Sequence, residues 1–386
     1  MADLSFPPAR VLKKWAKEIP TPCYVYDEIG LRQHADALFS AFSWNPGLSV
    51  VFPVRMNPNP AVLQIFAEAG CALECGTAEE LRLARNCGID GNRILYAPII
   101  RDVPGEQLAI QLRAAWLIHG PQVLPPEPPD TVWLCCNPGG YLTDGGRRIC
   151  NLDRNKFGMD RETLFSAAAR FSEFETTYVG LAFRAGDNEL DAAFPAASAK
   201  LLLSLAGEVT EKTGVRISGI QLSGMPGVCS REGYEAYGAS ACSRDIQKCF
   251  GDSELDLSLC SGRFLAAESG VFLTRVQHSV QRLHSALFTD CGFSQFPRTM
   301  MLGAWNPVSV LGKKTEFGKQ LYDIYGCLPD LRDRIAENRV LPPVKDGDIL
   351  MIHDVGADGF SLSGNYGGIE RCSEYLLRED QSFEKL

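Results

Sequence analysis

Clustered histidines and paired cysteines are both missing from this sequence. It has five histidines in 386 residues, and its fourteen cysteines include no Cys-x-x-Cys spacing. Because zinc and similar metals are held by closely spaced histidine and cysteine ligands, we expect no dedicated metal site. Cys135 and Cys136 lie in an apolar run, which is typical of small buried hydrophobic residues rather than of reactive thiols.

Long apolar segments and an excess of positive charge are absent as well. No stretch approaches the roughly eighteen uninterrupted apolar residues that cross a membrane, and the first residues lack a basic segment followed by an apolar one. The net charge of −9 disfavours nucleic acid and anionic membrane surfaces, because binding to either depends on clustered Lys and Arg. We expect a cytoplasmic protein whose partners are small molecules or proteins.

What the sequence does contain is an alternation of short β-rich runs with longer amphipathic segments, from about residue 31 to residue 267. With 45% hydrophobic and 22% charged residues, the chain is long enough for two well-packed domains. The expected strands are Leu48–Val54, Arg93–Tyr96, Ala115–Ile118, Val132–Cys136, Tyr178–Phe183, Gly219–Leu222 and Leu255–Leu259. The expected helices are Pro60–Ala69, Ala78–Cys87, Arg161–Phe171 and Ala193–Lys212. This alternation predicts an α/β fold, a (β/α)8 TIM barrel whose site lies at the carboxyl ends of its strands.

After about residue 270 the pattern changes. Three strand-rich segments follow without regular helices, at Val271–Val280, Arg298–Asn306 and Asp348–Val355. They predict a second domain that consists of β-strands.

Five segments, in chain order, resemble those of a known family. They are Thr21–Asp27, Phe52–Asn59, Asn155–Met159, Cys260–Arg263 and Gly356–Tyr366. All are similar to segments of the pyridoxal-phosphate decarboxylases of alanine-racemase fold (fold type III), which include diaminopimelate and ornithine decarboxylases. The resemblance spans nearly the whole chain. It implies a barrel over residues 31–269, and a β-sandwich or β-barrel domain that combines residues 1–30 with 270–386.

The segment around Arg55 departs from the family at its most important position. Phe52-Pro53-Val54-Arg55-Met56-Asn57 resembles the family's Tyr-Ala-Val-Lys-Ala-Asn, in which the lysine carries the cofactor. A guanidinium stays protonated and cannot supply the free amine that attachment to an aldehyde requires. The resemblance therefore implies pyridoxal phosphate as the family's cofactor, whereas the replacement predicts that none is covalently bound here.

Other cofactor contacts of the family are also replaced. The ring-stacking histidine corresponds to Arg184, and the glutamate that pairs with the pyridine nitrogen corresponds to Cys260. Of the three-glycine phosphate loop, Gly224 remains, and the tyrosine that reaches the phosphate corresponds to Asp358. A carboxylate close to a phosphate is repulsive, so this last change opposes cofactor binding.

The retained and replaced residues leave two interpretations of the former cofactor site open. Either Arg55, Arg184, Asp187 and Asp358 fill it as a paired network, or the two arginines form a fork for a carboxylate or phosphate. In the second case Gly224, Gly262, Arg263 and Asp333 complete the anion-binding residues. Cys260, Asp330 and Asp358 are then the candidates for proton transfer.

In the family, part of the site crosses a head-to-tail homodimer interface through a cysteine followed by an aspartate. The matching segment here keeps Asp330 and Asp333. Without gaps Pro329 takes the cysteine position, and a two-residue shift places Cys327 there. Both alignments stay open.

Three functions follow from these observations. The first is a diverged homologue that acts without covalent pyridoxal phosphate on a small anionic or amino-acid-derived substrate, in specialised biosynthesis. The second is a non-catalytic regulatory or partner subunit of an active decarboxylase, as antizyme inhibitor is to ornithine decarboxylase. The third is an active diaminopimelate- or ornithine-type decarboxylase with noncovalent pyridoxal phosphate.

Overall fold

The computed structural model describes residues 11, 19–125, 127–172, 178–229, 231, 237–280, 285–313 and 319–386. These residues form two units. The described residues within His34–Cys229 and Glu235–Phe264 make up one, and those within Met1–Gln33, Ser230–Tyr234 and Leu265–Leu386 make up the other. No helix in the described ranges has the length and apolar character needed to span a bilayer.

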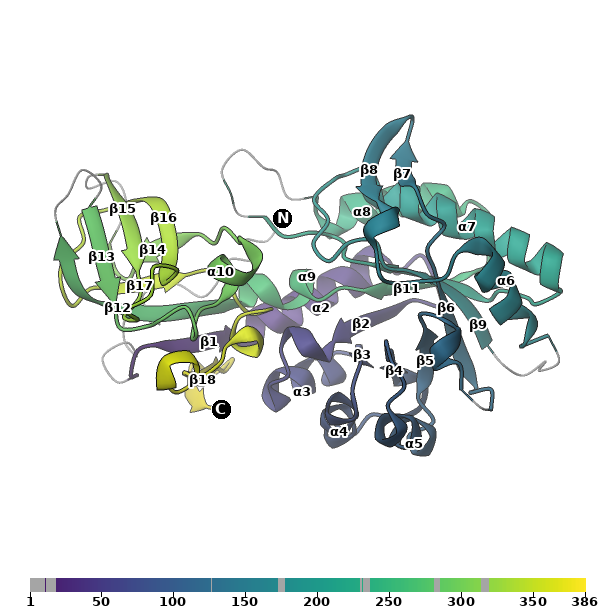
Figure 1. Ribbon diagram of the computed structural model, residues 1–386, viewed down its shortest axis with the longest axis horizontal. Coiled ribbons are helices and arrows are strands. Elements are labelled where there is room, and N and C mark those ends of the chain that lie inside the picture. Colours follow the sequence, from purple (N-terminus) through teal and green to yellow (C-terminus); the bar gives the residue numbers. More distant parts are fainter. Residues whose placement is uncertain are drawn as a thin grey trace. The chain divides into compact units, whose positions relative to one another are not determined.

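The first unit is built on a closed barrel of eight parallel strands, which confirms the predicted fold class (Figure 1). Its strands are mostly apolar, as expected where both faces of a parallel sheet are covered, and Glu74 and Gln221 are exceptions. In barrel order they are β2 (Ser49–Pro53), β3 (Ala72–Cys75), β4 (Ile94–Tyr96), β5 (Ala115–Ile118), β6 (Thr131–Cys136), β9 (Tyr178–Phe183), β10 (Gly219–Ser223) and β11 (Asp256–Cys260). The sequence prediction had missed β3, which has only four residues.

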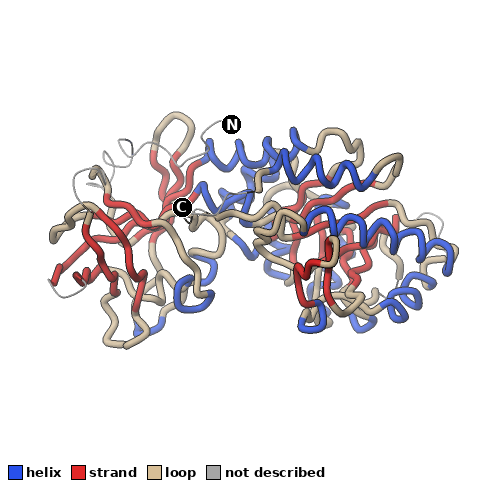
Figure 2. Tube along the Cα trace, turned by 90° about the horizontal axis from the view of Figure 1, so that it is seen from above, coloured by secondary structure: helices blue, strands red, loops and turns tan. Residues whose placement is uncertain are grey.

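Helices alternate with these strands and lie on the outside of the barrel (Figure 2). They are α3 (Pro60–Glu68), α4 (Ala78–Asn86), α5 (Val103–Gln111), α6 (Arg161–Ala169), α7 (Phe194–Thr213) and α8 (Ala239–Phe250). A hairpin of β7 (Tyr141–Asp144) and β8 (Arg147–Asn151) precedes α6.

Side-chain caps define where several helices begin. Asn59 accepts a hydrogen bond from the Ala61 amide at the start of α3, and Thr77 accepts one from the Glu80 amide at the start of α4. Asp160 caps α6 in the same way. Each cap satisfies an amide that a helix start would otherwise leave unpaired, so the turns that follow β2 and β3 have defined geometry. Those turns surround the carboxyl mouth of the barrel.

The second unit is a nine-stranded mixed sheet. Its strands are β1 (Cys23–Asp27), β12 (Gly270–Val280), β13 (Ser285–Thr289), β14 (Val308–Val310), β15 (Gln320–Tyr325), β16 (Arg334–Leu341), β17 (Ile349–Ile352), β18 (Ser373–Leu377) and β19 (Phe383–Lys385). Strand β1 pairs antiparallel with β12 and parallel with β18. The amino-terminal strand therefore belongs to the sheet of carboxyl-terminal strands, as predicted. Helices α2 (Glu28–Ala41) and α9 (Arg263–Ala266) complete the main elements.

One predicted strand is wrong. Residues 298–306 begin with a short helix, α10 (Arg298–Leu302), which follows Pro297 and ends at Gly303. Gly303 has a φ of +60°, the left-handed conformation that commonly terminates helices. The apolar run Met300 to Leu302 resembled a strand, but the proline before it and the glycine after it favour a single helical turn.

Candidate functional site at the carboxyl mouth of the barrel

Four side chains meet at the carboxyl end of the barrel, and three of them surround the carboxylate of the fourth. Glu74 lies in β3, and Cys260 is the last residue of β11. Arg55 lies in the short 3₁₀ helix that follows β2, and Arg184 directly follows β9. Because parallel strands end at the same mouth, these positions converge although they are far apart in sequence.

Glu74 is the centre of this cluster. Its Oε1 lies 2.6 Å from Arg55 Nη1 and 3.0 Å from Arg184 Nη1, while Oε2 pairs with Arg184 Nη2. The Cys260 thiol donates to Oε2 at 3.2 Å and also lies 3.8 Å from Arg184 Nη2. We call Arg55, Glu74, Arg184 and Cys260 the Glu74 cluster.

The two arginines differ in how much of each side chain is exposed. Glu74 and Arg184 expose 2% and 8% of their side chains, whereas Arg55 exposes 46%. Burial lowers the pKa of Arg184, although a guanidinium remains charged in proteins. Two guanidinium groups therefore face one carboxylate, and the negative charges of Glu80 and Asp187 also act on Arg55 and Arg184. Arg184 Nε is buried and makes no hydrogen bond among the described residues, so the buried end of the cluster is not fully satisfied.

His119 is a neighbour of this cluster. It follows β5, exposes 6% of its surface, and stacks obliquely on Phe157 with ring centroids 5.1 Å apart. Burial, then the charges of Arg55 and Lys156, lower the pKa of His119 to about 4, so the imidazole is neutral at pH 7. Its Nδ1 is buried and has no partner within the described part of the chain. A neutral imidazole with an unused nitrogen can accept or donate one hydrogen bond to a bound molecule.

The two glycines expected in the anion-binding set have packing roles. Gly224 has a φ of +75°, and a Cβ there would lie 2.0 Å from the Gly186 carbonyl oxygen. Its amide donates to the Cys260 carbonyl at 3.1 Å. A Cβ on Gly262 would meet Met56 at 2.6 Å, and Arg263 directly follows as the first residue of α9. Close packing alone explains both glycines.

The three aspartates predicted from the resemblance lie in the other unit. Asp330 forms an ion pair with Arg332 at 2.7 Å and accepts a hydrogen bond from the Tyr366 hydroxyl at 3.1 Å. Asp333 is buried and accepts hydrogen bonds from the Leu328 and Phe293 amides, both at 2.6 Å. These contacts give Asp333 a structural role in shaping the loop that precedes it.

Asp358 adopts a left-handed backbone with φ of +56°. Its carboxylate lies 3.7 Å from Arg298 Nη1, which also donates to the Ala357 carbonyl at 3.1 Å. Cys327 is one of the two alternatives for the family's interface cysteine. Its side chain is exposed to solvent, and the burial of its remaining part raises the pKa of its thiol.

Sequence reasoning missed Glu74 and gave His119 no role. A signal for Glu74 was present, since it is the one charged residue in the apolar run Cys71-Ala72-Leu73-Glu74-Cys75. A carboxylate on a short buried strand needs a charged partner, and the two arginines that follow β2 and β9 were the available candidates. For His119 the signal was its position directly after β5.

Comparison with known proteins agrees with the fold described above. Residues 23–356 match the family model described as pyridoxal-dependent decarboxylase, C-terminal sheet domain. Protein TabA of Pseudomonas amygdali pv. tabaci is 24% identical over 96% of this chain and 89% of its own length. Diaminopimelate decarboxylase of Methanothermobacter thermautotrophicus is 28% identical over 94% of this chain and 88% of its own.

Solved structures show the same fold. Diaminopimelate decarboxylase from M. jannaschii superposes with a TM-score of 0.88 at 22% identity, covering 96% of this chain and 90% of that one. The Helicobacter pylori enzyme complexed with L-lysine gives a TM-score of 0.85 at 19% identity, covering 97% and 95%. The chain belongs to the pyridoxal-dependent decarboxylase family.

Proposed function

We propose that this chain is a diverged member of the family that binds a small anionic or amino-acid-derived molecule at the Glu74 cluster without covalently bound pyridoxal phosphate. The observation that carries the proposal is the occupation of Glu74 by Arg55 and Arg184 together. The cluster consists of two guanidinium groups, a carboxylate and a thiol, and none of these is a primary amine.

The residues of the site do not meet the chemical needs of pyridoxal phosphate, which supports this proposal. Its aldehyde needs an amine, but the position after β2 carries Arg55, whose Nη1 is engaged with Glu74 at 2.6 Å. Its protonated pyridine nitrogen needs an acidic partner, and the end of β11 offers the Cys260 thiol, which already donates to Glu74. The donor set around Glu74 does not fit this cofactor.

The class of ligand follows from the charge of the cluster. Arg55 is the cationic side chain of the cluster that reaches solvent, and its N–H groups that do not contact Glu74 suit a carboxylate. His119 adds an uncharged hydrogen-bonding nitrogen nearby. The names of the relatives point to amino acids, since several are diaminopimelate decarboxylases and two solved relatives are complexed with L-lysine. Cys260 Sγ carries the thiol proton of the cluster, which it donates to Glu74 Oε2.

We also propose the head-to-tail homodimer that the family resemblance implies. Leu331 supports it, because this apolar side chain is 99% exposed between the ion-paired Asp330 and Arg332. A partner chain would cover this apolar side chain, which the described residues of the same chain leave in solvent. Light scattering of the purified chain tests this, with a monomer at micromolar concentration contradicting it.

The cofactor part of the proposal is tested by incubating the purified protein with pyridoxal phosphate, adding borohydride, and mapping modified peptides by mass spectrometry. We expect no modification in the barrel of the wild-type chain. Arg55→Lys, which supplies an amine beside Glu74, should gain a modification at residue 55. Lys156→Ala is the control for reaction at the exposed lysine near His119. A chromophore fixed to the barrel of the wild-type chain would overturn the proposal.

The ligand part is tested by calorimetry with L-lysine and with 1,5-diaminopentane, which has the same carbon chain without the carboxylate. We expect L-lysine to bind more tightly, and Arg55→Ala to weaken it about tenfold, as the loss of a charge-assisted hydrogen bond predicts. Arg82→Ala, at an exposed helix pair, is the matched control. Equal binding of the two compounds would contradict carboxylate recognition.

A further inference from the structure

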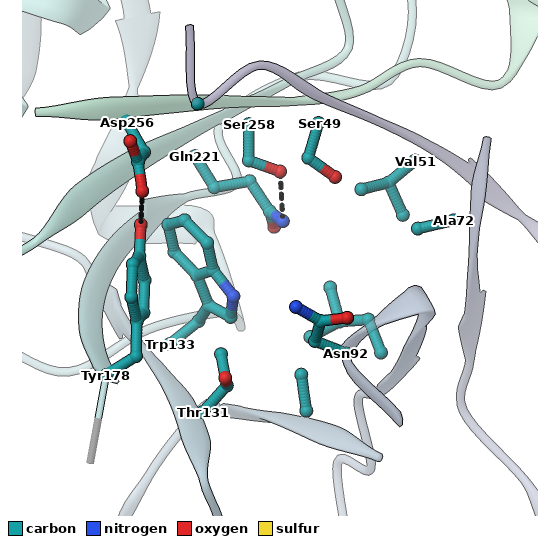
Figure 3. Close-up of a pocket in the computed structure, with 13 residues that line it drawn as sticks. Ser49, Val51, Ala72, Asn92, Thr131, Trp133, Tyr178, Gln221, Asp256 and Ser258 are labelled. Carbon is teal, nitrogen blue, oxygen red and sulfur yellow. Dashed lines mark hydrogen bonds between the residues drawn. The ribbon is translucent and has the colours of Figure 1, made fainter. Parts of the chain in front are cut away.

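A second polar site lies at the opposite, amino-terminal mouth of the same barrel. A cavity of about 130 Å³ is surrounded by residues that begin the strands, among them Ser49 of β2, Ala72 of β3 and Ala115 of β5 (Figure 3). Barrel interiors are normally filled by bulky branched side chains. Small residues at these strand starts leave the space open.

A buried glutamine faces this space. Gln221 exposes 1% of its surface, and its Nε2 donates to Ser258 Oγ at 3.1 Å. Its Oε1 is buried and accepts no hydrogen bond from any described residue. Figure 3 shows the amide group directed into the ring of lining side chains. An acceptor that is buried and unsatisfied calls for a donor from a bound molecule.

The side chains around the cavity indicate which kind of hydrogen-bond donor it would bind. Of the thirteen residues drawn in Figure 3, all described, Asp256 is the one with a charged side chain, and no Lys, Arg or His is present. The Tyr178 hydroxyl donates to Asp256 Oδ2 at 3.0 Å, and the Trp133 ring packs against Tyr178 with centroids 5.6 Å apart. A carboxylate, an unsatisfied amide oxygen and aromatic walls favour a cation and repel an anion.

The cavity also limits the size of the ligand. An engineered protein cavity of about 150 Å³ accommodates benzene. A volume of about 130 Å³ therefore suits a molecule of about five or six non-hydrogen atoms.

We propose that the amino-terminal mouth of the barrel binds a small primary ammonium compound with a short apolar tail. Its N–H group donates to Gln221 Oε1, its charge is complemented by Asp256, and its tail packs against Trp133. This site is separate from the Glu74 cluster and does not depend on the function proposed above.

Calorimetry with n-butylammonium, 1-butanol and butyrate on the full chain tests the proposal. We expect n-butylammonium to bind most tightly and butyrate not at all. The near-isosteric Gln221→Met removes the acceptor and should weaken n-butylammonium binding at least tenfold, whereas Gln221→Glu should tighten it. The matched control Gln64→Met, at an exposed glutamine of α3, should leave binding unchanged.

A crystal of the wild-type chain soaked in n-butylammonium gives a readout that does not depend on any variant. Density for the compound beside Gln221 is expected. Ordered water alone in that cavity, or butyrate binding as tightly as n-butylammonium, would overturn the proposal. So would a folded Gln221→Met protein with unchanged affinity.

Discussion

Arg184 forms an end-on, two-point pair with Glu74, with Nη1 3.0 Å from Oε1 and Nη2 paired with Oε2, and both side chains are buried. Two-point pairing of this kind fixes the orientation of both groups. The carboxylate that pairs with Arg184 therefore belongs to a residue of the protein, Glu74, and not to a ligand. In this arrangement Arg184 is paired within the protein, with Glu74 as its acid in place of the expected Asp187 and Asp358. The anion-binding hypothesis therefore depends on the more exposed Arg55.

Glu74→Gln is expected to destabilise the barrel by about 3 kcal/mol or more, because it leaves the Arg184 guanidinium buried without its counter-charge. The urea midpoint of unfolding measures the effect. Glu79→Gln, which breaks an exposed pair with Arg82, is the control and should cost less than about 1 kcal/mol. Equal effects of the two substitutions would contradict a structural role for the Glu74 cluster.

His119 is expected to make stability depend on pH. Its pKa is about 4 in the folded chain, below the ordinary value of 6.5, so the unfolded chain takes up this proton first as the pH falls. Stability that is fully present above pH 6.5 is therefore lost between pH 6.5 and 4, by about 3 kcal/mol.

In His119→Gln this part of the pH dependence should disappear. Urea midpoints at pH 7 and pH 4.5 measure it, with His278→Gln, at an exposed histidine, as control. An unchanged difference between the two pH values in His119→Gln would be evidence against the depressed pKa.

Asp333 and Asp330 are expected to respond differently to the same change. Asp333→Asn replaces a buried oxygen that accepts from a backbone amide, and should cost about 1–3 kcal/mol. Asp330→Asn weakens a pair with Arg332, whose side chain is largely exposed, and should cost less than about 1 kcal/mol. Denaturant unfolding compares them, and the reverse order would show that Asp333 is not the structural residue.

Gly224→Ala is expected to destabilise the barrel by at least about 1 kcal/mol, because the glycine has a positive φ and its missing Cβ faces the Gly186 carbonyl at 2.0 Å. Gly207→Ala in α7 is the matched control, since an added Cβ there meets no atom within 4 Å. It should stabilise the chain by about 0.5–1 kcal/mol. Thermal melts that rank the two variants the other way would contradict this assignment.

The fold was predictable because strand and helix periodicities alternate regularly and five segments follow a family order. The meeting of three barrel residues follows from the same fold: Arg55, Arg184 and Cys260 lie at or just after the ends of strands, and the structure brings them together. Glu74 was missed because β3, whose apolar run is interrupted by this charged residue, was not recognised as a strand. The unsatisfied Oε1 of Gln221 depends on three-dimensional packing that periodicity cannot show.

The position of β1 has a consequence for how the chain is made. This strand leaves the ribosome well before its hydrogen-bonding partners β12 and β18, which both lie beyond residue 269. Closing a loop of this length is slow, and both edges of β1 are paired only after β18 has been synthesised. A nascent chain released before residue 373 would expose one edge of an apolar strand, a ready starting point for aggregation.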